Sequence, residues 1–274
     1  MIPAGEKPAP DRPAIALHNV SRHFQGGRGG PVIALQGVTL EIAAERFVSI
    51  VGPSGCGKST LLNLIAGLLP PTSGQVSING APVTDVCPDL GFIFQKDALM
   101  PWKTVYENIA LPLVFRRVPR AEIHARVMAW IERVGLTGFE HHYPHQLSGG
   151  MRKRVALAQT LVYDPPIILM DEPFTALDVH TRDLMENELL RLWSELKTTI
   201  VFVTHDLEEA IALSDEVVVF TARPGRVKAR HPIDLPRPRN VAEIRTSPEF
   251  LKVYRKIWED LRDEVVASYG QQGG

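Results

Sequence analysis

The residues best suited to chemistry lie in one glycine-rich stretch, Arg46-Phe-Val-Ser-Ile-Val-Gly-Pro-Ser-Gly-Cys-Gly-Lys-Ser-Thr60. Its glycines allow backbone shapes that a Cβ would block, so that successive N–H groups can converge on phosphate oxygens. Lys58 adds a cation and Ser59 a hydroxyl that can bind Mg²⁺. The stretch therefore predicts a site for a nucleoside triphosphate. The alternative is an ordinary glycine-rich turn between core elements.

The sequence on either side predicts the elements that position this loop. Apolar residues before it suit a buried strand, and the apolar run 61–69 suits a helix. The positive N-terminal end of that helix would face the same phosphates. The spacing Gly-x4-Gly-Lys-Ser between a strand and a helix is the context that a phosphate loop requires.

Acidic residues follow a second apolar run. Residues 167–170 are typical of a parallel strand buried on both faces, and Asp171 and Glu172 stand at its carboxyl end. We expect Asp171 to hold Mg²⁺ and Glu172 to accept a proton from an attacking water. His205 follows another apolar run, 199–204, and should lie at the same edge of the sheet. The alternatives are a solvated pair of acids and a structural histidine.

Two further segments could contact a nucleotide. Ser148, Gly149 and Gly150 open a helix, and its free N–H groups could form a second phosphate site. An ordinary serine N-cap is the alternative. Phe24 precedes a glycine-rich loop and could stack on a base or belong to the core.

Composition limits the partners. Thirty Lys plus Arg nearly balance 31 Asp plus Glu, so no global field favours nucleic acid or an acidic membrane. No run of about 18 apolar residues occurs.

The two cysteines, Cys56 and Cys87, fit a reducing compartment. Because Cys56 adjoins Lys58 and a helix N-terminus, we expect a lowered thiol pKa and alkylation that ATP prevents.

Several local expectations concern packing. Two strands are predicted, at 33–35 and 38–42, and Leu184 is expected to pack within a helix at 182–196. Ser247 should cap a C-terminal helix whose apolar stripe docks on the body of the protein. The stripe comprises Phe250, Tyr254, Ile257, Trp258, Leu261 and Val265.

Together, these motifs resemble the nucleotide-binding subunit of ABC transporters across roughly residues 15–230. The signature Leu147-Ser-Gly-Gly-Met151 separates that family from kinases and GTPases. The other matching motifs are the Walker A loop at 52–60, the Q-loop glutamine Gln95, Walker B at 167–172, the D-loop at 175–178 and the switch histidine His205.

The resemblance implies an α/β fold with a phosphate-loop (RecA-like) core, an N-terminal antiparallel β part and an inserted α-helical subdomain. On this division 1–14 is a disordered tail, 15–95 and 160–235 form the ATP-binding core, 96–159 is the helical subdomain and 236–274 is a C-terminal extension.

The resemblance also implies a head-to-tail dimer in which each ATP lies between two copies. It assigns Glu172, His205, Lys58 and Gln95 to catalysis, and Ser59, Gln95 and Asp171 to Mg²⁺. The residues that it places at ATP are Phe24, Gly52, Pro53, Ser54, Gly55, Cys56, Gly57, Lys58, Ser59, Thr60 and Asp178 of one copy, with Ser148, Gly149 and Gly150 of the other.

Finer features, among them Leu99-Met-Pro-Trp-Lys-Thr104 and Asp234-Leu-Pro-Arg-Pro-Arg239, are similar to the nitrate, sulfonate and taurine importer branch. That branch implies an ATP-hydrolysing peripheral subunit on the cytoplasmic face of the inner or plasma membrane. Its partners would be a second copy, permease subunits and, indirectly, a periplasmic or lipid-anchored solute-binding protein, with no nucleic acid. Leu99, Met100 and Trp102 are expected to be exposed and to contact the permease.

Other functions remain as alternatives. The chain could serve another importer or exporter branch. A soluble ABC ATPase of DNA repair or translation is less favoured, because the chain has neither a long coiled-coil insertion nor two cassettes. A catalytically silent scaffold conflicts with the presence of Lys58, Asp171, Glu172 and His205.

Overall fold

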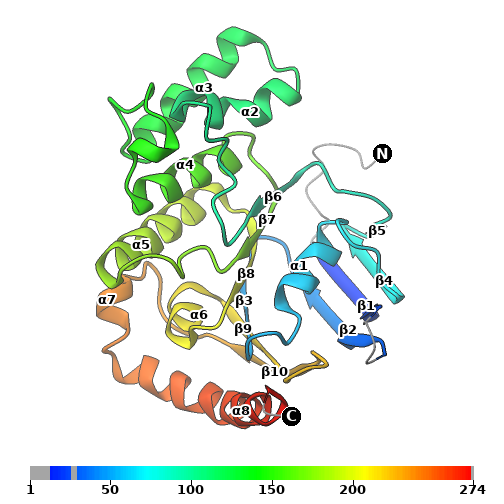
Figure 1. Cartoon of the computed structure of the whole chain (residues 1–274). Helices are drawn as coiled ribbons and strands as arrows, with labels where there is room; N and C mark the ends of the chain where they lie inside the picture. The colour runs from blue at the N-terminus through cyan, green and yellow to red at the C-terminus, as the bar shows by residue number, and fades with distance from the viewer. Residues whose placement is uncertain (1–12, 26–29, 273–274) are drawn as a thin grey trace.

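The computed structural model describes residues 13–25 and 30–272, so nearly all of the tail predicted at 1–14 lies outside the described residues. Two β-sheets form the core of the molecule (Figure 1). The first is antiparallel, with the order β2-β1-β4-β5. Its strands are β1 (Ile15–Phe24), β2 (Val32–Ile42), β4 (Ser73–Ile78) and β5 (Ala81–Pro82).

The second sheet has the order β10-β9-β3-β8-β7-β6 and is parallel except for β10, which pairs antiparallel with β9. Its strands are β3 (Phe47–Val51), β6 (Leu90–Ile93), β7 (Ile167–Asp171), β8 (Thr199–Thr204), β9 (Glu216–Phe220) and β10 (Val227–Pro232). Parallel strands bring their carboxyl ends to one edge, so the segments that follow β3, β6, β7 and β8 meet there.

Both faces of the parallel sheet are covered, because its strands are apolar on both sides. Val48 and Ile50 of β3 face a core shared with the antiparallel sheet and with α1 (Lys58–Ile65). Phe47 and Val51 face the opposite core. That core includes α5 (Val179–Leu196) and α6 (Leu207–Leu213). The alternation of side chains along a strand thus divides the interior into two layers.

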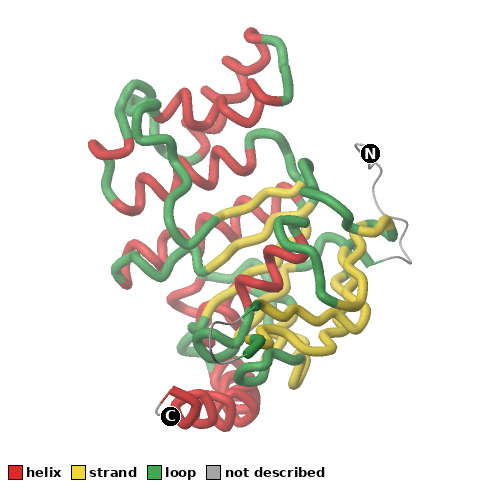
Figure 2. Tube along the Cα trace, turned by 45° about the vertical axis from the view of Figure 1, so that its right-hand side comes forward, coloured by secondary structure: helices red, strands yellow, loops and turns green. Residues whose placement is uncertain are grey.

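A helical part lies to one side of the strands, as Figure 2 shows. It contains α2 (Val105–Phe115), α3 (Arg120–Arg133), a short 3-10 turn (Pro144–Gln146) and α4 (Gly149–Leu161). A capping box starts α2: Thr104 Oγ1 accepts from Glu107 N at 3.2 Å, and Glu107 Oε2 accepts from Thr104 N at 2.8 Å. The α4 helix contacts β6 and α5, which joins this part to the sheet.

The C-terminal segment forms α7 (Val241–Ile244) and α8 (Pro248–Gln272). Ser247 Oγ accepts from Phe250 N at 3.2 Å, so the predicted serine cap is present. Phe250, Ile257 and Leu261 are buried, and α8 contacts α6, β9 and β10. The expected docking on the body of the protein is therefore confirmed. Within the described part of the chain, no helix combines the length and apolar character needed to cross a membrane.

Two local expectations were wrong, and one strand was missed. The strands predicted at 33–35 and 38–42 are parts of one strand, β2, because Gly37 takes a left-handed conformation (φ +60°) that lets the ladder continue past an irregularity. Leu184 is 63% exposed, because it lies on the outer face of α5 while Met185 and Leu189 face the core. The strand β10 was not predicted, because its residues are largely polar.

Candidate functional site: the phosphate loop and the carboxyl edge of the sheet

The phosphate loop connects β3 to α1. Gly55 and Gly57 adopt φ values of +76° and +103°, which glycine reaches without strain. A Cβ at Gly57 would lie 2.7 Å from the carbonyl oxygen of Ala34, so this position also needs the missing side chain. The loop can therefore turn its amides toward an anion at the start of α1.

Lys58 is buried at the first position of α1. Its Nζ donates to the carbonyl oxygens of Gly52 at 2.7 Å and Pro53 at 3.1 Å. These bonds fold the ammonium group back over the loop. The cation is thus held beside the amides that would contact phosphate oxygens.

Cys56 differs from its expectation. Its side chain is 1% exposed and packs in the core between the two sheets. Burial raises the pKa of the thiol and outweighs the lowering effects of Lys58 and of backbone hydrogen bonds. The expectation of a lowered pKa was therefore wrong, because the thiol of this loop faces the core. The alkylation that ATP prevents stays a prediction, and the burial of the thiol opposes it.

Ser59 and Asp171 lie next to each other although 112 residues separate them. Ser59 Oγ donates to Asp171 Oδ1 at 3.0 Å. Burial raises the pKa of Asp171, with a further rise from Glu172, while Ser59 and Lys58 lower it. A hydroxyl and a carboxylate are oxygen ligands of the kind that Mg²⁺ prefers. Among the described residues no group of three or more His, Cys, Asp or Glu is placed to hold a metal ion.

Glu172 has a left-handed backbone conformation, with φ +44°. For a residue with a side chain this costs on the order of 1 kcal/mol. The amide of Glu172 donates to Val203 O of β8 at 2.9 Å, which ties the turn to the neighbouring strand. Strained backbone of this kind is common at active sites.

The carboxyl group of Glu172 is the meeting point of three segments. Its Oε2 lies 3.0 Å from His205 Nδ1, 3.2 Å from Thr175 Oγ1 and 3.5 Å from Gln95 Nε2. These partners come from the ends of β8, β7 and β6. The expected position of His205 at the same edge as Glu172 is thus observed, whereas the contacts of Gln95 and Thr175 with Glu172 were not predicted.

Gln95 is joined to the helix that follows the signature. Its carbonyl oxygen accepts from Lys153 Nζ at 3.1 Å, and the same Nζ pairs with Asp97 at 2.8 Å. Lys153 is almost fully buried on α4. The sequence did not single out Lys153, because a lysine on a helix gives no sign of burial until its partners are known.

Ser148 caps α4 by accepting from Met151 N at 3.2 Å. Within the described residues no hydrogen bond or ion pair joins 148–150 to the phosphate loop, and Figure 1 shows α4 and α1 apart, with strands of the second sheet between them. The start of α4 instead lies beside the D-loop of the same chain. A Cβ at Gly149 would contact Leu177 Cδ2 at 3.6 Å. The two predicted phosphate sites are therefore separate in a single chain.

Two other predicted nucleotide contacts have local partners. Phe24 is partly buried at the end of β1, and the guanidinium of Arg22 lies 4.8 Å from its ring centre. Asp178 caps α5 by accepting from Thr181 N at 3.1 Å, a bond that also lowers the pKa of Asp178. Neither position contradicts a contact with ATP.

The C-terminal helix borders the site, which the sequence did not indicate. A hollow of about 670 Å³ lies between the loops and α8. Pro53, Ser54 and His205 line one side of this hollow, and Tyr254 and Trp258 of α8 line the other. The apolar stripe of α8 thus does more than dock on the body, because part of it faces the catalytic loops.

The predicted permease contact is only partly exposed. Trp102 is 70% exposed, and Met100 is half-buried. Leu99 is 8% exposed and belongs to the core, so the expectation that it is exposed was wrong. The buried Asn108 organises this loop. Its amide donates to the carbonyl oxygens of Met100, Lys103 and Thr104 at 3.2, 3.0 and 3.0 Å.

Comparison with known proteins agrees with this geometry. The family model described as ABC transporter matches residues 35–175. An uncharacterized ABC transporter ATP-binding protein of Methanocaldococcus jannaschii is 48% identical over 254 residues, which cover 93% of each chain. A taurine import ATP-binding protein, TauB, of Burkholderia thailandensis is 42% identical over 92% of this chain and 98% of its own length.

A solved structure is also similar. The ATP-binding cassette MJ0796, in a dimeric post-hydrolysis state bound to ADP and Pi, superposes with a TM-score of 0.71. It is 36% identical, and the match covers 81% of this chain and all of that one. With the phosphate loop, the paired acids and the histidine in place, the chain belongs to the ATP-binding family of ABC transporters, and it is an ATPase.

Proposed function

We propose that this chain is the ATP-hydrolysing subunit of an ABC importer for taurine, a sulfonate, nitrate or a related small solute. The similarity to a protein named taurine import ATP-binding protein supports an importer, because the match covers 92% of this chain. The branch features at 99–104 and 234–239 support the same class of solute.

The observation that carries hydrolysis is the shared contact of Glu172 Oε2 with His205, Thr175 and Gln95. A carboxylate held in this way can orient a water and accept its proton. The amides of the phosphate loop and the Lys58 ammonium would hold the phosphates, and would stabilise the charge that develops during phosphoryl transfer.

The residues present also fit Mg²⁺. Ser59, Asp171 and Gln95 would hold the ion, which when bound neutralises charge on the phosphate oxygens. Ser59 and Asp171 are already 3.0 Å apart. The carboxyl of Asp171 must be ionised for this role. Burial raises its pKa and opposes ionisation, Ser59 and Lys58 partly offset that rise, and a bound cation would favour the ionised form.

A second copy of the chain would complete each site. Residues 148–150 do not reach the phosphate loop of their own chain, so they would contact the ATP held by the partner. The dimeric state named for MJ0796 supports this arrangement. ATP would then join the two copies, and hydrolysis would release them.

The same proposal places the dimer against membrane permease subunits, at the cytoplasmic face of the membrane. Trp102 is the candidate contact, since a large apolar side chain that is 70% exposed is typical of an interaction site. A solute-binding protein would deliver the cargo to the permease from the other side.

The test of this function is transport in proteoliposomes that contain the chain, its permease and its solute-binding protein. ATP-driven uptake of labelled taurine, with competition by other sulfonates or nitrate, is expected. The Glu172→Gln variant should abolish uptake while leaving the assembly intact. Efflux instead of uptake, or uptake of an unrelated solute such as a sugar, would contradict the proposed function.

A further inference from the structure

Two loops leave neighbouring strands of the second sheet and end in helices that contact each other. One runs from β7 to α5 and includes Leu177, which packs beside the start of α4. The other runs from β8 to α6 and includes His205. Each helix begins at an aspartate cap, Asp178 for α5 and Asp206 for α6. A side chain between these helices can therefore contact both loops.

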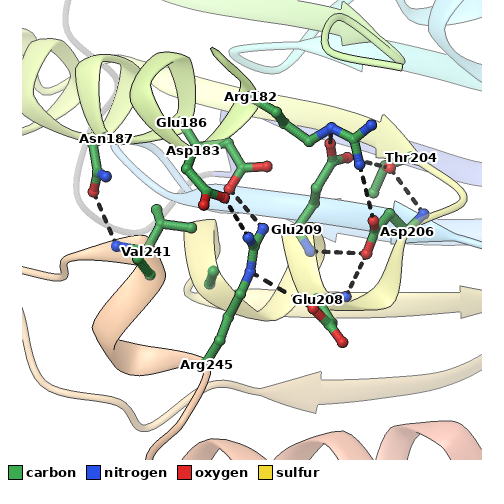
Figure 3. A network of polar contacts seen from close by, with 12 residues as sticks. Arg182, Asp183, Glu186, Asn187, Thr204, Asp206, Glu208, Glu209, Val241 and Arg245 are labelled. Atoms are coloured by element: carbon green, nitrogen blue, oxygen red, sulfur yellow. Dashed lines mark hydrogen bonds and ion pairs between the residues drawn. The ribbon is translucent and has the colours of Figure 1, made fainter. Parts of the chain in front are cut away.

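Arg182 occupies this position, in the first turns of α5. Its Nη2 donates to Leu177 O at 3.1 Å, within the first loop. Its Nη1 lies 3.6 Å from Asp206 Oδ2, and its Nε lies 3.8 Å from Glu209 Oε1. Figure 3 shows the guanidinium between Glu209 and Asp206. Arg182 thus links the loop before α5 to the loop before α6.

The acids that Arg182 approaches hold the residues on either side of His205. Thr204 Oγ1 donates to Glu209 Oε2 at 2.5 Å and accepts from Asp206 N at 3.0 Å. Asp206 Oδ1 in turn accepts from the amides that start α6. The imidazole of His205 projects from between these two anchored neighbours and contacts Glu172. A displacement of Glu209 or Asp206 would therefore move the imidazole.

The charged side chains in Figure 3 include more acids than arginines, so no other base among them can take over the role of either arginine. Two arginines, Arg182 and Arg245, face five acids: Asp183, Glu186, Asp206, Glu208 and Glu209. Arg245 comes from the C-terminal extension and binds Asp183 at 2.5 Å and Glu186 at 2.8 Å. Its Nε also lies 3.8 Å from Glu208 Oε2 on α6. Arg182 contacts the two acids that hold the neighbours of His205, Asp206 and Glu209.

Arg182 lies close to the two carboxylates without forming hydrogen bonds to them. Its Nε is buried without a hydrogen-bond partner among the described residues, and its two carboxylate contacts exceed hydrogen-bond length. Charge attraction at these distances persists when the groups shift by a fraction of an ångström. The contact can therefore shorten or lengthen as the two loops move, without a strong bond being broken.

We propose that Arg182 is a positioning residue that couples the loop carrying Leu177 and Asp178 to the loop carrying His205. A movement at the start of α4 would reach His205 through Leu177 and Arg182. The inference rests on the proposed role of His205 in hydrolysis, but the position of the imidazole can be tested separately from activity.

The first test is the NMR signal of the His205 imidazole in the full-length chain labelled with ¹⁵N-histidine, assigned by its loss in His205→Gln. Arg182→Met should shift or broaden this signal, and Arg182→Lys, which keeps the charge, should have a smaller effect. Arg191→Met is the matched control. Arg191 lies on the same helix and pairs with Glu188 and Glu195, away from His205. An unchanged His205 signal in a folded Arg182→Met variant would overturn the proposal.

The second test is kinetic. Arg182→Met should lower kcat on the order of tenfold, while affinity for a non-hydrolysable ATP analogue stays within about twofold. Because Arg182 acts through His205, the same substitution should have little further effect in His205→Ala. Equal losses in both backgrounds would contradict the coupling.

If Arg182→Met does not fold, Arg182→Lys decides by the same two measurements. Full activity of His205→Ala would instead contradict the proposed role of His205. The NMR measurement would still test whether Arg182 positions the imidazole.

Discussion

Nδ1 of His205 lies 3.0 Å from Oε2 of Glu172, and the two residues come from the ends of adjacent parallel strands. The imidazole is half exposed, whereas the carboxyl group is mostly covered. A hydrogen bond of this kind restricts the direction of the carboxylate. This geometry suits the proposed role of Glu172 in accepting a proton from water.

Glu172→Gln should reduce kcat about 100-fold or more, because the amide cannot accept a proton from water. ATP binding should persist, since Lys58 and the loop amides are unchanged. Steady-state ATPase assays and isothermal titration with ATP measure the two effects. Glu259→Gln, at an exposed position on α8, is the control and should have wild-type activity. A Glu172→Gln variant with normal turnover would move the general base elsewhere.

Trp102→Ala should weaken the attachment of the chain to its permease. The indole is exposed in a loop whose backbone Asn108 holds, so truncation removes a contact without disturbing the fold. Co-purification of the two proteins in detergent should fall, while the ATPase rate of the isolated chain stays the same. Leu251→Ala removes an exposed apolar side chain from α8 and should leave co-purification intact. Equal retention of both variants would exclude Trp102 from the interface.

The local pattern of the sequence was enough to predict the phosphate loop, the buried strands and the capped α8, because each depends on neighbours within a few residues. The common edge of Glu172 and His205 could also be predicted, since parallel strands end together. The division of the chain into a core, a helical subdomain and an extension stays a prediction.

Properties that depend on distant partners could not be predicted. Leu99 and Leu184 have similar apolar character, yet the first is buried and the second exposed, because the packing of neighbouring helices decides which side of each segment is covered. Lys153 and Arg182 became informative only when the fold placed Gln95, Leu177 and Asp206 beside them. Periodicity gives the face of a helix, but not the identity of the groups across from it.

Cys56 should resist alkylation in the folded protein. The thiol is buried, so a reagent cannot reach it easily, and its pKa is raised, so little of it is in the reactive thiolate form. Native protein treated with iodoacetamide should show little modification at Cys56 by mass spectrometry, with or without ATP. Urea should make it reactive. Cys87, at the margin of the core, should react faster and serves as an internal control. Rapid modification of Cys56 that ATP prevents would support the original expectation.

Glu186 should make the protein less stable as pH rises. Its side chain is fully buried, and burial raises its pKa from 4.5 to about 8, although Arg245 opposes the shift. Glu209, Asp183 and Asp206 raise it further. Between these two pKa values the folded protein holds a proton that the unfolded chain has lost. The free energy of unfolding should therefore fall with increasing pH, by at most about 1.4 kcal/mol per pH unit.

Urea unfolding at pH 6 and pH 8 measures this loss, and Glu186→Gln should diminish it. The amide keeps the shape and the neutral state of the protonated acid, so the variant should gain relative stability at the higher pH. Glu188→Gln is the control, because Glu188 lies two residues further along α5 on its other side, with its carboxyl partly accessible beside Arg191. If Glu186→Gln instead leaves the pH dependence unchanged, the buried carboxyl is ionised throughout this range. Arg245 would then hold it as a salt bridge, and Arg245→Met would be the more destabilising change at both pH values.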